Sequence, residues 1–347
     1  MTLHEILDAA TQRGASDVHL LPGRSPVFRI NGYIESSPLP VLDAESLHAL
    51  LRAHLSDKQA QTYAESHELC FSLHLPEHGF YRVNLATHLG QPEATIRIGH
   101  REVPSTEALG LPEALIEAVR RPHGLVLITG ATGAGKTTTL NALINRVNTE
   151  ERKKIITIEE PVEFIHPQKR SLVIQREIGL DSQSYHGALR HALRQDPDII
   201  CIGEMRDLDT ISSALTAAET GHLVLGTLHT SGAVGTISRI IDVFPARQQN
   251  QIRAQLAESL QATISQRLLP RADGSGRTLV YELMLATTSV RNIIRDGRSN
   301  QLTNIIQTHR NIGMRQMDHM IRDAYEAGEI TFETAASALS NPRIIGA

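Results

Sequence analysis

The sequence has few cysteines, and they are not arranged for disulfides or for a metal site. Cys70 and Cys201 are the two it has, they lie far apart, and neither belongs to a C-x-x-C pair. A disulfide framework and a four-cysteine zinc module both require closely spaced cysteines. Neither is therefore indicated.

Long hydrophobic runs are also missing. A membrane-spanning helix needs about 18 to 20 consecutive apolar residues, and no run in the chain approaches that length. The N-terminus carries His4, Glu5 and Asp8 and lacks the basic and apolar regions of a signal peptide. We therefore expect a cytosolic protein.

The chain has no excess of positive charge. Its 34 Lys and Arg residues against 38 Asp and Glu give a formal charge of −4, so no broad basic field is present and no nucleic-acid partner is expected. The 17 histidines are scattered without the spacing of metal ligands. With 41% hydrophobic and 21% charged residues over 347 positions, the composition is typical of a globular chain with room for two domains.

A phosphate-binding loop is the clearest motif that is present. Residues 130–138 read Gly-Ala-Thr-Gly-Ala-Gly-Lys-Thr-Thr and match the pattern G-x-x-x-x-G-K-[ST]. The apolar run 124–129 predicts a buried strand before the loop. Apolar residues at helical spacing from Leu140 to Val147 predict a helix after it. Strand, loop and helix follow one another as a nucleotide-binding loop requires.

Each part of the loop has its own role in binding a nucleoside triphosphate. Glycines let backbone N–H groups turn toward the phosphates, and the positive end of the following helix points to the same place. Lys136 supplies a cation, and the hydroxyl of Thr137 is available to Mg²⁺. ATP and Mg²⁺ are therefore the expected cofactors. The candidate nucleotide-binding residues of the loop are Gly130, Thr132, Gly133, Ala134, Gly135, Lys136, Thr137 and Thr138.

The first hundred residues predict a small α+β domain. Thr2 and Glu5 form a capping box for a first helix, which Gly14 ends. A leucine-rich second helix follows, and Ser56 with Gln59 form a capping box for a third. Strands are expected over residues 16–21, 27–34, 69–75, 80–87 and 94–98.

A second domain is expected beyond a linker. Residues 104–112 concentrate Pro, Gly and Ser and would join the N-terminal domain, 1–103, to a domain over 113–347. Short apolar strands alternate there with helices, which predicts a mostly parallel sheet covered on both faces, with ligands at the carboxyl ends of its strands. After Thr287 the chain is expected to be helical, with a loose tail over 342–347. Strands are expected over 125–129, 155–159, 199–203, 223–228 and 278–284, and helices over 113–120, 184–194 and 208–220.

Acidic residues follow two of these strands. One strand delivers Glu204 at its end, as a Walker B strand presents its acid to Mg²⁺. Another leads into Glu159, Glu160 and Glu163, around a proline. Carboxyl ends of parallel strands meet at one edge of a sheet, so these carboxylates are expected near the phosphate-binding loop.

These motifs resemble those of the secretion and type IV pilus ATPases over essentially the whole chain. Residues 157–163 resemble the Asp box of that family, 203–207 its Walker B motif and 220–229 its His box. Residues 14–20 and 289–296 resemble the retraction ATPases in particular. The resemblance implies a RecA-like P-loop ATPase domain in the α/β class, preceded by a smaller α+β, PAS-like N-terminal domain.

The chain departs from the family pattern at a few positions. Assembly ATPases of the family typically carry a four-cysteine module and extra N-terminal domains, and this chain has neither. Ala131 stands where Pro is usual and Glu160 where Asp is usual, and the late motif differs at Ser289, Val290, Ile293 and Asp296.

The resemblance also implies roles for single residues. Glu163 would polarise the attacking water, Glu204 would hold the Mg²⁺ shell or the γ-phosphate, and His229 would sense the γ-phosphate. Arg82 and Arg97, in the N-terminal domain, match family arginines that reach toward the nucleotide. The same resemblance places His222 among the nucleotide-binding residues, with a purely structural role as the alternative.

Together these features predict a motor. Hydrolysis would require the arginine-bearing domain and the P-loop domain to close, and product release would let them part. The resemblance implies a homohexamer, cytoplasmic and peripheral at the inner membrane of a bacterium, which retracts type IV pili against a membrane platform protein and so drives twitching motility. A second pilus motor ATPase is a further candidate partner. Residues 289–296 would transmit the motion or contact the platform, besides packing a helix inward.

Two alternatives remain open. One is an assembly or DNA-transfer ATPase of the same superfamily. The other is a nucleotide-binding ring with little turnover of its own that regulates another motor.

Overall fold

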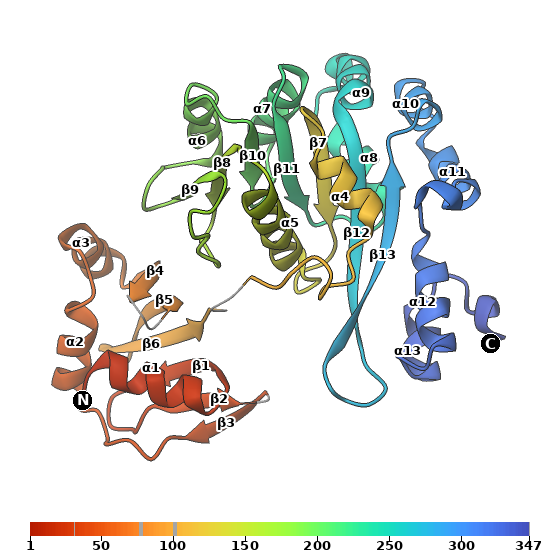
Figure 1. Cartoon of the computed structure of the whole chain (residues 1–347). Coiled ribbons are helices and arrows are strands. Elements are labelled where there is room, and N and C mark those ends of the chain that lie inside the picture. Colours follow the sequence, from red (N-terminus) through yellow and green to blue (C-terminus); the bar gives the residue numbers. More distant parts are fainter. Residues whose placement is uncertain (31, 76–78, 100–102, 347) are drawn as a thin grey trace. The chain divides into compact units, whose positions relative to one another are not determined.

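The computed structural model describes residues 1–30, 32–75, 79–99 and 103–346. The chain forms two compact units, each with its own sheet and its own hydrophobic core (Figure 1). Unit 1 comprises Met1–Glu102 and the short segment Pro161–Ile165, and unit 2 comprises Val103–Glu160 and His166–Ala347.

Unit 1 contains an antiparallel six-stranded sheet whose strand order is β3-β2-β1-β6-β5-β4. One face of the sheet packs against the first two helices through a core that includes Ile6, Leu47, Tyr81 and Ile96. The helices are α1 (Leu3–Gln12), α2 (Ala44–Arg52) and α3 (Asp57–Ser66), and the strands are β1 (Ala15–Leu20), β2 (Val27–Ile30), β3 (Tyr33–Ser36), β4 (Glu68–Leu75), β5 (Gly79–His88) and β6 (Gln91–Ile98).

The capping boxes predicted at the starts of α1 and α3 are both present, so these local signals are confirmed. The single strand expected over 27–34 is wrong. It is a hairpin of β2 and β3, because Gly32 has a φ of 86°, in the left-handed region that favours glycine and reverses the chain.

Unit 2 contains a seven-stranded sheet with the order β13-β12-β7-β11-β10-β8-β9. All neighbouring pairs are parallel except β12 with β13, which confirms the mostly parallel sheet. The prediction missed β9 and β12. The strands are β7 (Gly124–Thr129), β8 (Lys154–Glu159), β9 (Leu172–Glu177), β10 (Ile199–Ile202), β11 (Leu223–Leu228), β12 (Leu260–Pro270) and β13 (Arg277–Leu285).

Helices cover both faces of this sheet, as predicted (Figure 1). In β7, Leu125 and Leu127 belong to one core cluster and Val126 and Ile128 to the other, because successive strand residues point to opposite faces. The helices are α4 (Glu113–Val119), α5 (Lys136–Glu150), α6 (Tyr185–Ala192), α7 (Leu208–Glu219), α8 (Ala233–Asp242), α9 (Ala246–Ser259), α10 (Thr288–Arg295), α11 (Leu302–Thr308), α12 (Met317–Glu326) and α13 (Phe332–Ala338).

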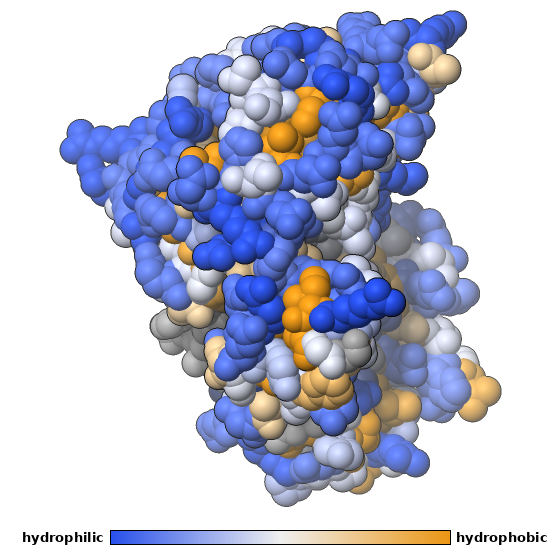
Figure 2. Space-filling view, turned by 90° about the vertical axis from the view of Figure 1, so that its right-hand side faces the viewer, coloured by the Kyte–Doolittle hydropathy of each residue, from blue (hydrophilic) through white to orange (hydrophobic). Residues whose placement is uncertain are grey.

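The C-terminal part of unit 2 is helical from α10 onward, which confirms that prediction. The loose tail expected over 342–347 is wrong for Pro342–Ile345, which form a short 3₁₀ helix capped by Asn341; residue 347 lies outside the described residues. On the side of unit 2 that carries α10 to α13, hydrophobic residues are interrupted by hydrophilic ones (Figure 2). In the described part of the chain, no helix combines the length and the apolar character needed to cross a membrane.

Candidate active site

The phosphate-binding loop lies between β7 and α5, where the sequence predicts it. Its glycines are required by the backbone. Gly130, Gly133 and Gly135 have φ values of 145°, 79° and 85°, which residues with a side chain rarely adopt. A Cβ at Gly130 would lie 2.5 Å from the carbonyl oxygen of Gln266 on the neighbouring strand β12. The loop therefore holds its backbone close to the sheet and leads directly into the N-terminus of α5.

Lys136 is buried within this loop. Its Nζ donates hydrogen bonds to the carbonyl oxygens of Gly130, at 2.8 Å, and Ala131, at 3.0 Å. Burial lowers the pKa of Lys136, and the negative charge of Glu204 opposes that shift. The ammonium group is thus positioned by the loop that it serves.

A chain of polar contacts runs from Lys136 across the ends of the neighbouring strands. Lys136 Nζ lies 3.4 Å from His229 Nδ1, and His229 Nε2 lies 2.9 Å from Glu204 Oε1. A neutral imidazole with its hydrogen on Nε2 satisfies both contacts, since Nδ1 then accepts and Nε2 donates. His229 follows β11 and Glu204 lies just beyond β10, the next two strands after β7 in the sheet. The structure therefore brings together three of the predicted site residues.

Arg206 completes this chain, and the sequence did not single it out. Its Nη2 donates to Glu204 Oε2 at 2.7 Å, and its Nη1 lies 3.6 Å from Glu160 Oε2. Burial alone would raise the pKa of Glu204, but the hydrogen bonds from Arg206 and His229 and the positive charge of Arg206 outweigh it and hold that pKa below its usual value. Glu204 is therefore an ionised carboxylate at neutral pH.

The donor set fits a magnesium ion. Mg²⁺ prefers oxygen ligands and commonly takes one or two protein groups beside phosphate oxygens and water. The ionised Glu204 carboxylate and the partly exposed Thr137 hydroxyl, at the start of α5, are such groups.

The other predicted acid, Glu163, belongs to the segment Pro161–Ile165 of unit 1, where its side chain is exposed. A Cβ on Gly99, at the end of β6, would lie 3.6 Å from the backbone oxygen of Glu163. Glu163 therefore belongs to the same compact unit as the two predicted arginines.

Those arginines lie in a row of charged residues on the sheet of unit 1. Arg29, Asp17, Arg97 and Arg82 are directly opposite one another on β2, β1, β6 and β5. Arg97 Nε donates to Asp17 Oδ1 at 2.9 Å, and Arg82 Nε lies 3.5 Å from Cys70 Sγ. Burial alone would raise the pKa of Asp17, but hydrogen bonds from Ser16 and Arg97 outweigh it and lower that pKa. An ionised Asp17 thus orients Arg97.

His222 lies at the amino end of β11, whereas His229 follows its carboxyl end. At about 3.3 Å per residue the six-residue strand separates the two histidines by roughly 20 Å. His222 Nδ1 lies 3.1 Å from the carbonyl oxygen of Ala217 in the last turn of α7. These contacts are those of a residue that ends a helix, and they place His222 at the end of β11 away from the phosphate-binding loop.

A buried link between α5 and the chain after β8 was also missed. His166 Nε2 lies 2.7 Å from Asn141 Oδ1, and Asn141 Nδ2 donates to the carbonyl oxygen of Thr137 at 2.9 Å. Asn141 lies four residues after Thr137 on α5, the one sequence signal that could have suggested the contact.

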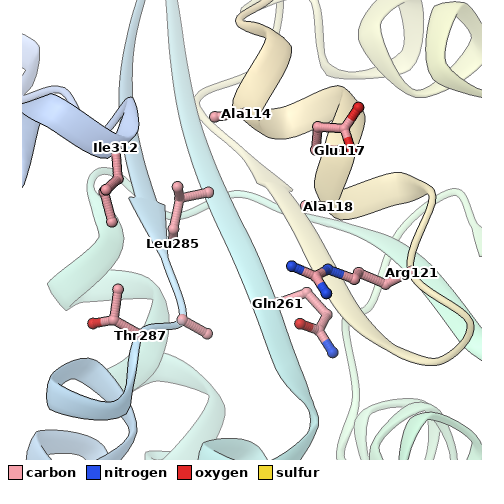
Figure 3. A pocket seen from close by; sticks show the side chains of 9 residues that line it. Ala114, Glu117, Ala118, Arg121, Gln261, Leu285, Thr287 and Ile312 are labelled. Carbon is pink, nitrogen blue, oxygen red and sulfur yellow. The ribbon is translucent and has the colours of Figure 1, made fainter.

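A separate hollow of about 440 Å³ lies among α4, β12 and the end of β13 (Figure 3). Arg121 and Gln261 lie on one side of it, and Leu285 and Ile312 on the other (Figure 3). Gln261 is the second residue of β12, which runs parallel to β7. The hollow is therefore at the amino ends of these strands, opposite the phosphate-binding loop.

Comparisons with known proteins find relatives over almost the whole chain. A model of the family described as type II/IV secretion system protein matches residues 1–337. The chain is 42% identical over 342 residues to the type IV pilus retraction ATPase PilT of Pseudomonas aeruginosa, covering 99% of both chains. It is 42% identical over 317 residues to a twitching motility protein of Neisseria gonorrhoeae, covering 91% of this chain and 85% of that one. It also resembles the crystal structure of the pilus retraction motor PilT with bound ADP, with a TM-score of 0.93 and 42% identity over 99% of this chain and 98% of that one.

Proposed function

Because the chain belongs to the family of type II/IV secretion system proteins, we propose that it is an ATPase motor that retracts type IV pili and so drives twitching motility. The observation that carries the proposal is the 42% identity to a retraction ATPase along almost the whole chain, together with the contacts among Lys136, His229 and Glu204 beside the phosphate-binding loop.

The residues of unit 2 bind and orient the nucleotide. Backbone N–H groups of the loop and the positive end of α5 hold the phosphates, and Lys136 adds a mobile charge. Thr137 and Glu204 would hold Mg²⁺, which supplies positive charge to the phosphates when bound. His229, in contact with both Lys136 and Glu204, is placed to respond to the presence of a γ-phosphate.

Unit 1 contributes the remaining groups. Glu163 polarises the attacking water, and Arg82 and Arg97 stabilise the charge of the transition state. Because these residues belong to one unit and the phosphate-binding loop to the other, hydrolysis depends on closure of the two units and product release on their separation. In a homohexamer at the cytoplasmic face of the inner membrane, this cycle moves a platform protein at the base of the pilus. A second pilus motor ATPase is a further candidate partner.

A Lys136→Ala variant tests the direction of the motor. The change removes a phosphate contact, so phosphate release from ATP by the purified protein should be lost. Cells with this chromosomal change should accumulate surface pili that they cannot withdraw. Lys169→Ala removes an ammonium group that donates to Asn145 and Thr149 on α5; it is the matched control and should leave both readouts unchanged. Cells without pili would instead identify an assembly motor, and unchanged pili would argue against retraction.

The low-turnover alternative has its own test. Glu163→Gln keeps the size of the side chain and removes the charge that activates water. Phosphate release should fall strongly relative to the unchanged protein. Equal and negligible release by both proteins would favour a regulatory ring.

A further inference from the structure

Residues 229–232 connect β11 to α8 and are called the His229 turn below. The helix that follows this turn, α8, has no capping side chain of its own. The N-cap residue of α8 is Gly232, and the first N–H groups of a helix need acceptors from outside it. Two side chains from other strands supply them. Ser265 Oγ accepts from the N–H of Gly232 at 2.7 Å, and Glu282 Oε1 accepts from the N–H of Ala233 at 2.7 Å. The start of α8, three residues after His229, is therefore fixed from β12 and β13.

Thr129, Ser265 and Glu282 form a polar row across the sheet of unit 2. They are directly opposite one another on β7, β12 and β13. Thr129 Oγ1 lies 2.8 Å from Ser265 Oγ, and both residues are buried, at 0% and 1% exposure. Thr129 immediately precedes Gly130 of the phosphate-binding loop. The polar row thus connects the beginning of that loop to the beginning of α8.

Glu282 also interacts with the C-terminal helices. Burial raises the pKa of Glu282, and hydrogen bonds from the N–H groups of Ala233 and Met317 oppose that shift. Met317 is the first residue of α12. Next to Glu282, Leu283 exchanges backbone hydrogen bonds with Arg315, at 2.9 Å and 3.1 Å, which holds the chain before α12 against β13. One carboxylate therefore lies at the N-termini of two helices, where negative charge is favourable for both.

The close fit at this point leaves little room for change. A Cβ on Gly232 would lie 3.4 Å from Glu282 Oε1, and the φ of Gly232 is 76°. Thr236 Oγ1 donates to the carbonyl oxygen of Gly232 at 2.8 Å and lies 2.7 Å from Thr230 Oγ1. The His229 turn is therefore fixed by contacts with Glu282 and with Thr236. A displacement of the turn would alter the hydrogen bond to Glu282.

We propose that Glu282 is a positioning residue that couples the His229 turn to α12. It holds the turn in the arrangement that reads the γ-phosphate, and it transmits to the C-terminal helices the difference between the ATP-bound and ADP-bound states. The proposal rests on the proposed function, because it requires a nucleotide at the phosphate-binding loop.

Steady-state kinetics of Glu282→Gln provide the first test. The variant keeps the size of the side chain but loses the negative charge of the carboxylate, which accepts hydrogen bonds from two backbone N–H groups. We expect kcat for ATP hydrolysis to fall about tenfold, as loss of a charge-assisted hydrogen bond implies. The dissociation constant of ADP should stay within about twofold, because ADP has no γ-phosphate for the turn to read.

Glu329→Gln is the matched control. Glu329 Oε2 accepts from Thr278 Oγ1 of β13 at 2.7 Å, so this variant also alters a partly exposed carboxylate against the same strand. It should leave kcat unchanged, because its contacts in the described part of the chain, with Thr278, Ala272 and Ala324, do not lead to the His229 turn. An equal loss in both variants would indicate general damage to the C-terminal part and would overturn the proposal.

Hydrogen exchange tests the coupling itself. In the unchanged protein, a non-hydrolysable ATP analogue compared with ADP should alter exchange both at residues 228–236 and at 314–320. In Glu282→Gln the difference at 314–320 should disappear. If Glu282→Gln does not fold, Ser265→Ala removes the neighbouring acceptor from Gly232 and should lower kcat in the same direction.

No phosphate release by the unchanged protein would contradict the proposed function. Normal release together with a Glu282→Gln variant that keeps its kcat and its nucleotide-dependent exchange at 314–320 would overturn the role of Glu282 alone.

Discussion

At the scale of single residues, His166 shows how a buried titratable group links function to stability. Asn141 donates its amide hydrogen to Thr137, so its Oδ1 faces His166 and requires a hydrogen on Nε2. The other ring nitrogen, Nδ1, is buried and has no hydrogen-bond partner within the described ranges. Burial, helped by the charge of Lys169, lowers the pKa of His166 to about 4. The imidazole ring of His166 is therefore neutral at neutral pH.

This pKa predicts a loss of stability in acid. An unfolded histidine has its ordinary pKa of 6.5, so between pH 6.5 and about 4 the unfolded chain binds a proton that the folded chain does not. The free energy of unfolding should therefore decrease as the pH falls through this range. The difference of 2.5 pKa units corresponds to about 3 kcal/mol. Denaturant unfolding at pH 7 and at pH 4.5 measures it.

The comparison should be made with His166→Gln, which keeps an amide hydrogen for Asn141 and does not titrate. Part of the acid-dependent loss should be absent in this variant. His191→Gln, a change on the exposed side of α6, is the control and should retain the full loss. Identical pH dependence in His166→Gln and the unchanged protein would contradict the assignment.

Sequence patterns and the family resemblance were sufficient to name part of the candidate site. Lys136 and Glu204 follow from the P-loop pattern and from a strand-end acid, whereas His229 follows from the resemblance of residues 220–229 to the His box of the family. Arg206 and His166 could not, because each acts through a partner that only the fold brings near. The same limit applies to Glu282, which reads in the sequence as one more residue of a strand.

At the scale of elements, β12 shows where the sequence signal fails. It is 11 residues long and lies beside the P-loop strand, yet its apolar pattern is interrupted by Thr263, Ser265 and Gln266, which are all almost fully buried. Gln266 donates to Thr139 of α5 at 2.8 Å, and Ser265 caps α8. Ser265 and Gln266 thus serve contacts around the loop, and such polar residues hide the pattern of a core strand.

Helix α10, which carries the late motif, has an internal role that the sequence could not reveal. The predicted inward packing of Val290, Ile293 and Ile294 is confirmed. Arg291 Nη1 donates to the carbonyl oxygens of Ala257 and Glu258, both at 2.5 Å, in the last turn of α9. The guanidinium therefore satisfies carbonyls that a helix C-terminus leaves without partners.

Arg291→Ala should consequently destabilise the protein. Removing a charged donor from partly buried carbonyls costs about 1.5 to 3 kcal/mol, which should lower Tm by roughly 5 °C for a unit of this size. Differential scanning fluorimetry measures the shift. Arg295→Ala removes an exposed ion pair with Glu258 from the same helix and should change Tm by less than about 2 °C. A normal Tm in Arg291→Ala, together with lost pilus retraction, would instead show that Arg291 acts on motion or on a partner.

At the scale of the whole molecule, the chain divides its proposed chemistry between two units with separate cores. The segment Pro161–Ile165 belongs to unit 1 although it lies in sequence between β8 and β9 of unit 2. Its Val162 and Phe164 are buried, at 6% and 2% exposure, and these two apolar residues flank the exposed Glu163. Sequence periodicity cannot assign so short a segment to one core or the other.

This division predicts that an arginine of unit 1 accelerates ATP hydrolysis but does not contribute to the binding of ADP. An arginine that stabilises phosphoryl transfer is worth about 10³ to 10⁵ in kcat, so Arg97→Ala should lower kcat by about 10³ or more while the dissociation constant of ADP changes little. Arg29→Ala is the matched control, because Arg29 faces the same Asp17 from the other neighbouring strand and instead donates to the carbonyl oxygen of Gly32 at 2.9 Å.

Arg97→Lys should not restore the rate, since an ammonium lacks the planar fork of donors that contacts both a carboxylate and a phosphate. A kcat within a few-fold of normal in Arg97→Ala, or an equal fall in Arg29→Ala, would mean that this face acts through its general charge, and closure of the two units would then need another chemical reason.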